Sequence, residues 1–149
     1  MKKIYLLWAS ILLCGSLHAQ SSNLELGVSL VGPTGINAKV WIDRGQAIDL
    51  AFSLDAGSDF GFLYLHADYL KHLYGKFQVD GGEMPFYFGV GGKGLFGTNT
   101  SAGIRLPIGV TYLYGKPIFD VFFELAPSLD VYPNARFYFQ GAMGFRFFL

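Results

Sequence analysis

The chain has 149 residues, 11 Lys and Arg against 11 Asp and Glu, and 52% hydrophobic residues. This balanced charge gives no reason to expect nucleic acid as a partner. The one long apolar run, residues 4–13, is shorter than the roughly 18 residues of a transmembrane helix, so a dense β-sandwich or a membrane β-barrel remains.

The amino terminus is predicted to be a secretory signal peptide over residues 1–19. Two lysines precede the apolar run, and small residues end at Ala19. Cleavage there leaves residues 20–149 as the mature domain, with a net charge near −2. It also removes Cys14, the only cysteine. A lipoprotein anchored through Cys14 is less favoured, because Leu13 stands where a small residue is expected.

Eight segments of the mature chain alternate apolar and polar residues with the period of two that marks a half-buried strand. In chain order they cover residues 23–30, 36–42, 47–55, 62–70, 85–93, 103–114, 119–126 and 137–149. Tight turns with Pro and Gly separate some of them. Longer links are expected at 56–60, 72–83, 93–101 and 127–136. We therefore predict one all-β domain, an eight-stranded antiparallel up-and-down barrel.

The apolar face of these strands is predicted to meet lipid. Charged residues make up 15% of the chain, below the ~25% of a typical soluble domain, and aromatic residues gather near the strand ends as they do at membrane interfaces. The fold is therefore expected to be a transmembrane barrel of the outer membrane. The predicted lipid-facing residues are Leu50, Phe52, Leu65, Phe88, Val110, Phe123, Phe139 and Phe145.

The opposite face is predicted to fill the barrel interior, which in an eight-stranded barrel leaves no open pore. The predicted interior polar network consists of Glu25, Lys39, Asp49, His66, Asp68, Arg105, Asp120, Glu124, Gln140 and Arg146. An unpaired charge there costs on the order of several kcal/mol, so these groups are expected to pair. Three cations against five carboxylates leave an acidic excess, which water or protonation near the barrel ends is expected to absorb.

The stretches "GPTGINAKVW", "AIDLAFS", "YLHADYL", "PFYFGVGGKG", "GIRLPIGVTYLY" and "FDVFFELAPSLDVYP" cover nearly all of the mature chain. In them the sequence resembles an uncharacterised family of small, OmpA/OmpX-like eight-stranded outer-membrane β-barrel proteins. The resemblance implies this fold and an outer-membrane location. It implies no catalytic or binding residues.

The expected role is structural or that of a small interaction protein. Its expected partners are outer-membrane lipid and lipopolysaccharide, and the barrel-assembly machinery during biogenesis. The carboxy-terminal stretch "FYFQGAMGFRFFL" resembles the signal read by that machinery, with Phe145, Phe147 and Leu149 as its predicted residues, although Leu149 stands where Phe is usual. The sequence identifies no extracellular partner.

Two other functions remain open. Ser53, His66 and Asp68 lie on the inward face of neighbouring strands and could support acyl transfer in a lipid A deacylase or acyltransferase. The deacylase pattern of His followed two residues later by Ser is absent, because position 68 is Asp. A soluble secreted ligand-binding barrel is the other alternative.

No cofactor and no metal site are expected. The stretch "GVGGKG" at 89–94 has the spacing of a nucleotide-binding loop, but no helix is predicted after it to present its amino terminus to a phosphate. After export only His66 and His72 remain as histidines, and no cysteine remains, which gives a zinc site little support.

Overall fold

The computed structural model describes residues 23–32, 34–55, 61–77, 79–115 and 118–149. The predicted signal peptide over 1–19, Cys14 and the predicted link at 56–60 lie outside the described residues. Within the described part, no helix is long and apolar enough to cross a membrane.

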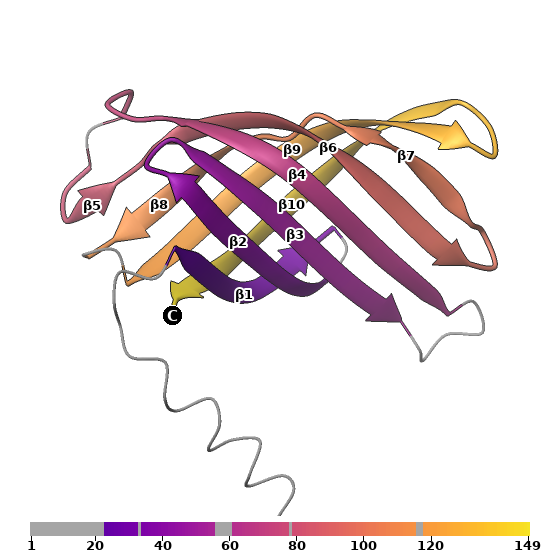
Figure 1. The fold of residues 1–149 in the computed structure, drawn as a ribbon, viewed down its shortest axis with the longest axis horizontal. Helices are drawn as coiled ribbons and strands as arrows, with labels where there is room; N and C mark the ends of the chain where they lie inside the picture. Colours follow the sequence, from indigo (N-terminus) through magenta and orange to yellow (C-terminus); the bar gives the residue numbers. More distant parts are fainter. Residues whose placement is uncertain (1–22, 33, 56–60, 78, 116–117) are drawn as a thin grey trace, which may run out of the picture.

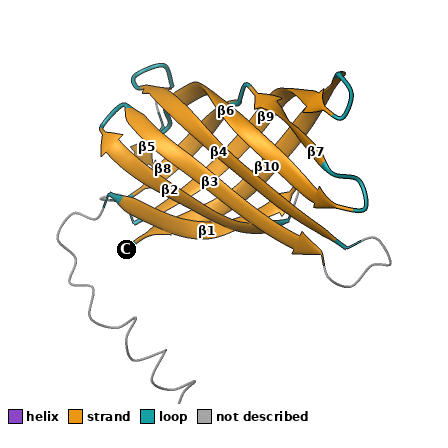
Figure 2. Cartoon of the chain, turned by 45° about the vertical axis from the view of Figure 1, so that its right-hand side comes forward, coloured by secondary structure: helices purple, strands orange, loops and turns teal. Residues whose placement is uncertain are grey.

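The described chain folds into one closed antiparallel β-barrel (Figures 1 and 2). Its strands are β1 (Leu24–Val31), β2 (Gly35–Asp43), β3 (Gln46–Asp55), β4 (Phe62–Leu73), β5 (Gly82–Glu83), β6 (Phe86–Gly97), β7 (Ser101–Arg105), β8 (Ile108–Tyr114), β9 (Phe119–Tyr132) and β10 (Arg136–Phe148). The last strand, β10, pairs with both β9 and β1, which closes the sheet into a ring. The predicted antiparallel barrel is confirmed.

These ten segments make an eight-stranded barrel, because β5 and β6 form one interrupted barrel strand and β7 and β8 form another. The interruptions fall at Pro85 and Pro107, whose nitrogens carry no hydrogen to donate to the ladder. Their carbonyls still accept hydrogen bonds, from the Thr111 amide at 3.1 Å and the Gly89 amide at 2.8 Å. The prediction of one continuous strand over 103–114 was therefore wrong at its proline.

Three of the expected long links are shorter in the structure. β6 continues to Gly97 and β9 to Tyr132, which leaves connections of residues 98–100 and 133–135. The glycines and prolines of these segments suggested turns, but the segments pair with neighbouring strands, as Pro127 does opposite Phe139. In the link expected at 72–83, β4 runs on to Leu73 and β5 takes up the last two residues.

Apolar side chains lie on the outside of the barrel and charged ones inside. Of the eight predicted lipid-facing residues, seven are exposed and Val110 is half-buried. The outer aromatic rings contact one another near the strand ends. Tyr114 and Phe119 lie 5.3 Å apart at one end, and Phe137 and Phe139 lie 5.2 Å apart toward the other, between ring centroids.

The strand ends separate into two groups. The ends of β2, β4 and β8 lie at the same end of the barrel as the start of β1 and the carboxy terminus, at the left in Figure 1. The ends of β3, β6 and β9 lie at the opposite end. This is the grouping expected for a meander with an even number of barrel strands.

Two adjacent glycines of β6 test the packing of the interior. A Cβ added at Gly91 would lie 1.9 Å from Asp68 Oδ1 and 2.4 Å from the Ala67 carbonyl oxygen, whereas one added at Gly92 would meet only the Gly103 oxygen, at 4.0 Å. Gly91→Ala should destabilise the barrel by about 1–3 kcal/mol, as overpacking does. Gly92→Ala should change stability by no more than ~0.5 kcal/mol. Urea unfolding in lipid vesicles measures both, and equal midpoints would contradict this packing.

Candidate functional site

The polar interior of the barrel is the candidate functional site. All ten residues predicted for the interior network lie on the inner face. His66 and Gln140 are half-buried, and the other eight are buried. They form two clusters, each centred on an arginine, with a contact between Asp49 and His66 joining the two.

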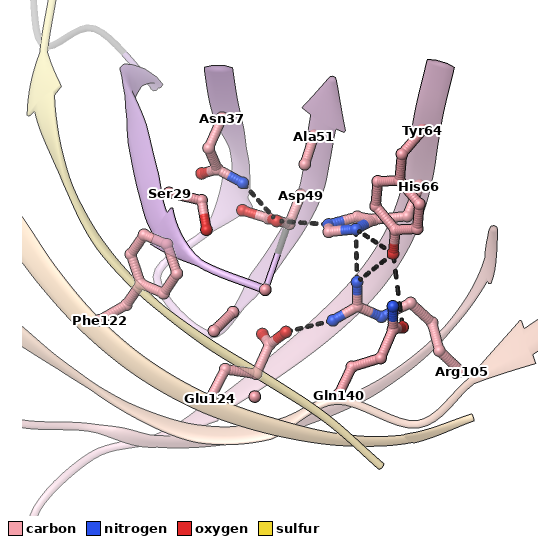
Figure 3. A pocket seen from close by; sticks show the side chains of 13 residues that line it. Ser29, Asn37, Asp49, Ala51, Tyr64, His66, Arg105, Phe122, Glu124 and Gln140 are labelled. Atoms are coloured by element: carbon pink, nitrogen blue, oxygen red, sulfur yellow. Dashed lines mark hydrogen bonds and ion pairs between the residues drawn. The ribbon is translucent and has the colours of Figure 1, made fainter. Parts of the chain in front are cut away.

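The first cluster surrounds Arg105 of β7 (Figure 3). Its Nη2 donates to Glu124, its Nη1 donates to the Tyr64 hydroxyl at 3.2 Å, and Nη1 also contacts Nδ1 of His66. The Arg105 Nε lies 3.3 Å from Asp68 Oδ2. One guanidinium therefore connects side chains from β4 and β9 across the interior.

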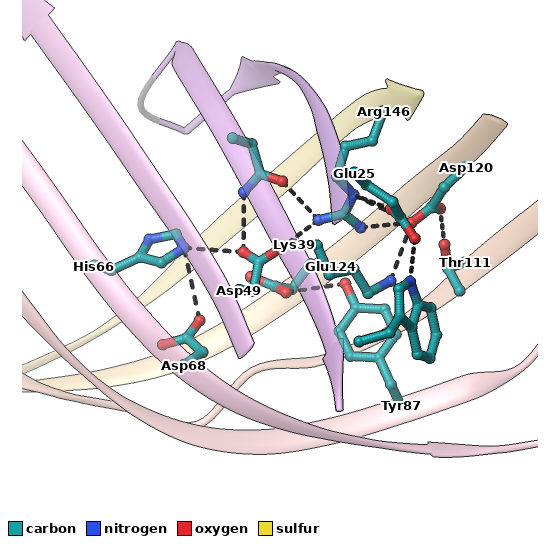
Figure 4. A network of polar contacts seen from close by, with 12 residues as sticks. Glu25, Lys39, Asp49, His66, Asp68, Tyr87, Thr111, Asp120, Glu124 and Arg146 are labelled. Carbon is teal, nitrogen blue, oxygen red and sulfur yellow. Dashed lines mark hydrogen bonds and ion pairs between the residues drawn. The ribbon is translucent and has the colours of Figure 1, made fainter. Parts of the chain in front are cut away.

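The second cluster surrounds Arg146 of β10 (Figure 4). Nη1 of this arginine donates to Asn37 at 2.6 Å and to Asp49 at 2.5 Å, and Nη2 donates to Asp120 at 2.8 Å. Its Nε lies 3.1 Å from Glu25 Oε2. Arg146 thus holds groups from β1, β2, β3 and β9 around the closing strand.

Lys39 completes the second cluster. Its ammonium donates to Asp120 Oδ2 at 3.0 Å and lies 4.4 Å from the centre of the Trp41 ring, in cation–π geometry. The Trp41 indole N–H donates to Glu25, and Thr111 donates to the other oxygen of Asp120. Side chains from several strands therefore surround the carboxylates of this cluster, although the buried Oε2 of Glu25 accepts no hydrogen bond among the described groups.

A third polar group contains residues that the sequence analysis did not include. Lys93 of β6 donates to Asp130 of β9 at 2.5 Å and contacts the Tyr138 hydroxyl. Lys93 is 8% and Asp130 7% exposed. The predicted strand over 85–93 ends with Lys93 on its polar face, but Asp130 was expected to lie in the link at 127–136, which hid this pair. The period-two alternation continues through both segments and could have revealed it.

An apolar cluster fills the interior near the end where the chain begins and ends. Trp41, Ala47 and Leu113 are buried there, and Tyr74 and Phe148 pack against them. Burial raises the pKa of Tyr74, in the β4–β5 connection, to about 12. Burial thus favours the neutral phenol of Tyr74, which packs against this apolar cluster.

A small polar cavity lies among side chains of the two arginine clusters (Figure 3). It has a volume of about 20 Å³, and Asp49, His66, Arg105 and Gln140 are among the residues that line it. This volume is enough for one water molecule.

The residues of the acyl-transfer alternative do not form a relay in the described contacts. The Ser53 hydroxyl donates to the Thr34 carbonyl at 2.5 Å. His66 contacts Asp49 at 3.3 Å and Asp68 at 3.7 Å through Nε2, and it contacts Tyr64 through Nδ1. The described hydrogen bonds join His66 to Asp49, Tyr64 and Arg105, and none joins it to Ser53.

The predicted assembly-signal residues lie at the end of the closing strand. Phe145 and Phe147 point outward opposite Val28 and Leu26 of β1. The exposed Leu149 donates its amide to the Leu24 carbonyl at 3.1 Å. The carboxy-terminal stretch therefore completes the ring.

Replacing the central arginine should be strongly destabilising. Arg146→Met removes the cation that Glu25, Asp49 and Asp120 share, and breaking a buried ion pair in this way typically costs about 3–5 kcal/mol. Arg44→Met is the control, because the Arg44–Glu83 pair is 75% and 53% exposed and should contribute about 1 kcal/mol or less. Urea midpoints for folding into vesicles compare them, and similar losses in the two variants would contradict the proposed central role.

No family model matches the sequence, and no curated protein matches it. Among solved structures, the chain is similar to the crystal structure of Ail, the attachment invasion locus protein of Yersinia pestis, with 11% identity and a TM-score of 0.45 over 83% of this chain and 92% of that one. A similarity of this size carries no argument about function. The assignment of the fold therefore rests on the strand pairing described above.

Proposed function

We propose that this protein is an integral outer-membrane β-barrel with a packed polar interior and a structural or small interaction role. One observation carries the proposal, namely the reversed placement of apolar and charged side chains about a closed barrel. Phe123 and Phe139 are 60% and 61% exposed, whereas Lys39 and Asp120 are 0% exposed.

This distribution fits lipid better than water as the surrounding medium. Soluble proteins rarely expose contiguous apolar surface larger than a few hundred Å². In this barrel, apolar side chains are exposed on the outer faces of β1, β2, β3, β4, β6, β7, β8, β9 and β10. A soluble ligand-binding barrel would instead line its interior with apolar side chains and carry its charges outside.

The backbone also meets the requirement of a lipid environment. Every N–H and C=O in hydrocarbon has to be satisfied within the protein, and a closed barrel does this without a free strand edge. The β10–β1 ladder supplies that closure, from Glu25 opposite Phe148 to Val31 opposite Met143.

The proposal further includes export through the signal peptide and assembly by the barrel-assembly machinery. Outer-membrane lipid and lipopolysaccharide would surround the exposed aromatic belt. Short connections at 98–100 and 133–135 leave little room for a large binding surface, which favours a structural or small interaction role. The two arginine clusters and the apolar cluster that fill the interior support a barrel without an open pore.

A charge on the outer face tests the lipid-facing assignment. Phe123→Arg should cost about 2–4 kcal/mol near the membrane midplane and reduce assembly in the outer membrane. Phe123→Leu, the matched control, should assemble normally because it keeps the site apolar. Membrane fractionation and heat-dependent gel mobility report the outcome. Wild-type amounts of folded Phe123→Arg in the membrane fraction, or release of the wild-type protein without detergent, would contradict the proposal.

Conductance in a planar lipid bilayer tests the filled interior. The reconstituted wild-type protein should give no steady stepwise current, because side chains occupy the interior of an eight-stranded barrel. Leu113→Ala, which opens the apolar cluster without removing a charge, should also give none, since the arginine clusters remain. Reproducible channel steps from the wild-type protein would rule out a packed barrel.

A further inference from the structure

Three interior side chains of neighbouring strands place metal-ligating atoms together. Asp49 of β3 lies directly opposite Asp68 of β4, and His66 lies two residues before Asp68 on the same face. The His66 Nε2 is 3.3 Å from Asp49 Oδ2 and 3.7 Å from Asp68 Oδ2, and one ligand atom from each residue lies within 4.8 Å of the others. We propose that Asp49, His66 and Asp68 bind a divalent transition-metal cation such as Zn²⁺ inside the barrel.

The spacing suits such an ion. Zinc bonds to nitrogen and carboxylate oxygen of about 2.0–2.2 Å, at tetrahedral angles, separate two ligand atoms by about 3.4 Å. Both contacts of the His66 Nε2 are close to this separation. An imidazole with two carboxylates is also a donor set that favours zinc and similar metals over calcium or magnesium.

Asp68 gives a second, independent reason to expect a cation. Its side chain is fully buried, and neither carboxylate oxygen has a hydrogen-bond partner among the described groups. The Arg105 Nε is 3.3 Å from Oδ2, but this ion-pair contact does not have the geometry of a hydrogen bond. Buried carboxylate oxygens are rarely left in this state, and a bound ion is one established cause.

The placement of Asp49 opposite Asp68 is a further reason to expect a cation between them. Like charges directly opposite each other on neighbouring strands destabilise a sheet. In Figure 4 the His66 ring reaches both carboxylates from one side. A cation held between the three groups would replace this repulsion with attraction.

The charge of the interior matches a doubly charged ion. The two arginine clusters contain five buried carboxylates but three cations, Lys39, Arg105 and Arg146. The Lys93–Asp130 pair of the third polar group neutralises itself. An excess of two negative charges therefore remains among the described interior residues, and one divalent cation would balance it.

The surroundings can orient the ligands. Asn37 Nδ2 donates to Asp49 Oδ2 at 2.9 Å, and Arg146 holds the other oxygen. Binding through Nε2 leaves the His66 proton on Nδ1, where the Tyr64 hydroxyl oxygen lies 3.1 Å away and can accept it. The adjacent cavity of about 20 Å³, lined by Asp49 and His66, has room for one water as a further ligand.

Arg105 competes with the ion in this arrangement. Its guanidinium contacts His66 Nδ1 and lies beside Asp68, so binding requires it to move toward Glu124, with which it already pairs. Removing its charge should therefore strengthen metal binding. A general loosening of the interior would have the opposite effect.

Calorimetry with Zn²⁺ alone tests the site, using protein purified from membranes in detergent and stripped of metal with a chelator. The wild-type protein should bind one Zn²⁺ per chain. His66→Gln and Asp68→Asn should bind it about tenfold more weakly or worse, and Arg105→Gln should bind it more tightly. Asp130→Asn is the matched control, because it removes a buried carboxylate outside the cluster, and it should bind Zn²⁺ as the wild type does. Heat-dependent gel mobility shows whether each variant is folded, and only folded variants are compared.

Four results would overturn the proposal: no Zn²⁺ binding by the wild-type protein, unchanged binding by folded His66→Gln, equal losses in Asp130→Asn and Asp68→Asn, or weaker binding by folded Arg105→Gln. Absence of binding would mean that protons neutralise the interior. Competition by equimolar Ca²⁺ would contradict the role of the imidazole. None of these results bears on the outer-membrane location, which the Phe123 variants test separately.

Discussion

The hydrogen bonds and ion pairs of Arg146 hold the interior of this barrel together. One guanidinium from β10 binds Glu25 of β1, Asn37 of β2, Asp49 of β3 and Asp120 of β9. Its face also lies 4.1 Å from the centre of the Phe122 ring. A planar group with five donors suits this position better than a lysine ammonium. Lys39, the other cation of this cluster, shares Asp120 with it.

The alternation of the sequence made much of this predictable. A period of two assigns each side chain to one face, and that rule placed the ten predicted network residues inside before any strand was paired. The pairing of distant partners was not predictable. Arg146 and Asp49 are 97 residues apart, and they meet because of the tilt and stagger of the strands. Local pattern carries no information about stagger.

The errors at strand ends have a common physical cause. Glycine and proline usually mark turns in soluble proteins. In this barrel, Gly94 pairs with both Leu65 and Ala102, and Pro127 lies within β9. A narrow, strongly curved sheet can place glycine where little bulk fits, and it tolerates proline where no ladder hydrogen bond has to be donated. Treating the segment around Pro127 as a link also removed Asp130, the partner of Lys93, from the expected interior.

The sequence analysis did not anticipate the proposed metal site, because it weighed only histidine and cysteine as ligands. The carboxylates that complete the cluster come from two neighbouring strands, and their meeting depends on register, Asp49 opposite Asp68. A hairpin whose strands carry inward carboxylates at paired positions, with a histidine two residues away, is the signal that could have revealed it.

The position of Arg146 on the last strand affects how the barrel forms. Until β10 arrives, Glu25 and Asp49 lack their arginine partner, and a sheet of the preceding strands holds unneutralised carboxylates on its concave face. Docking of β10 completes the backbone ladder and neutralises the interior in one event. Partially closed sheets therefore lack both kinds of stabilisation, so folding should be cooperative and the chain should gain little stability before its last residues are in place.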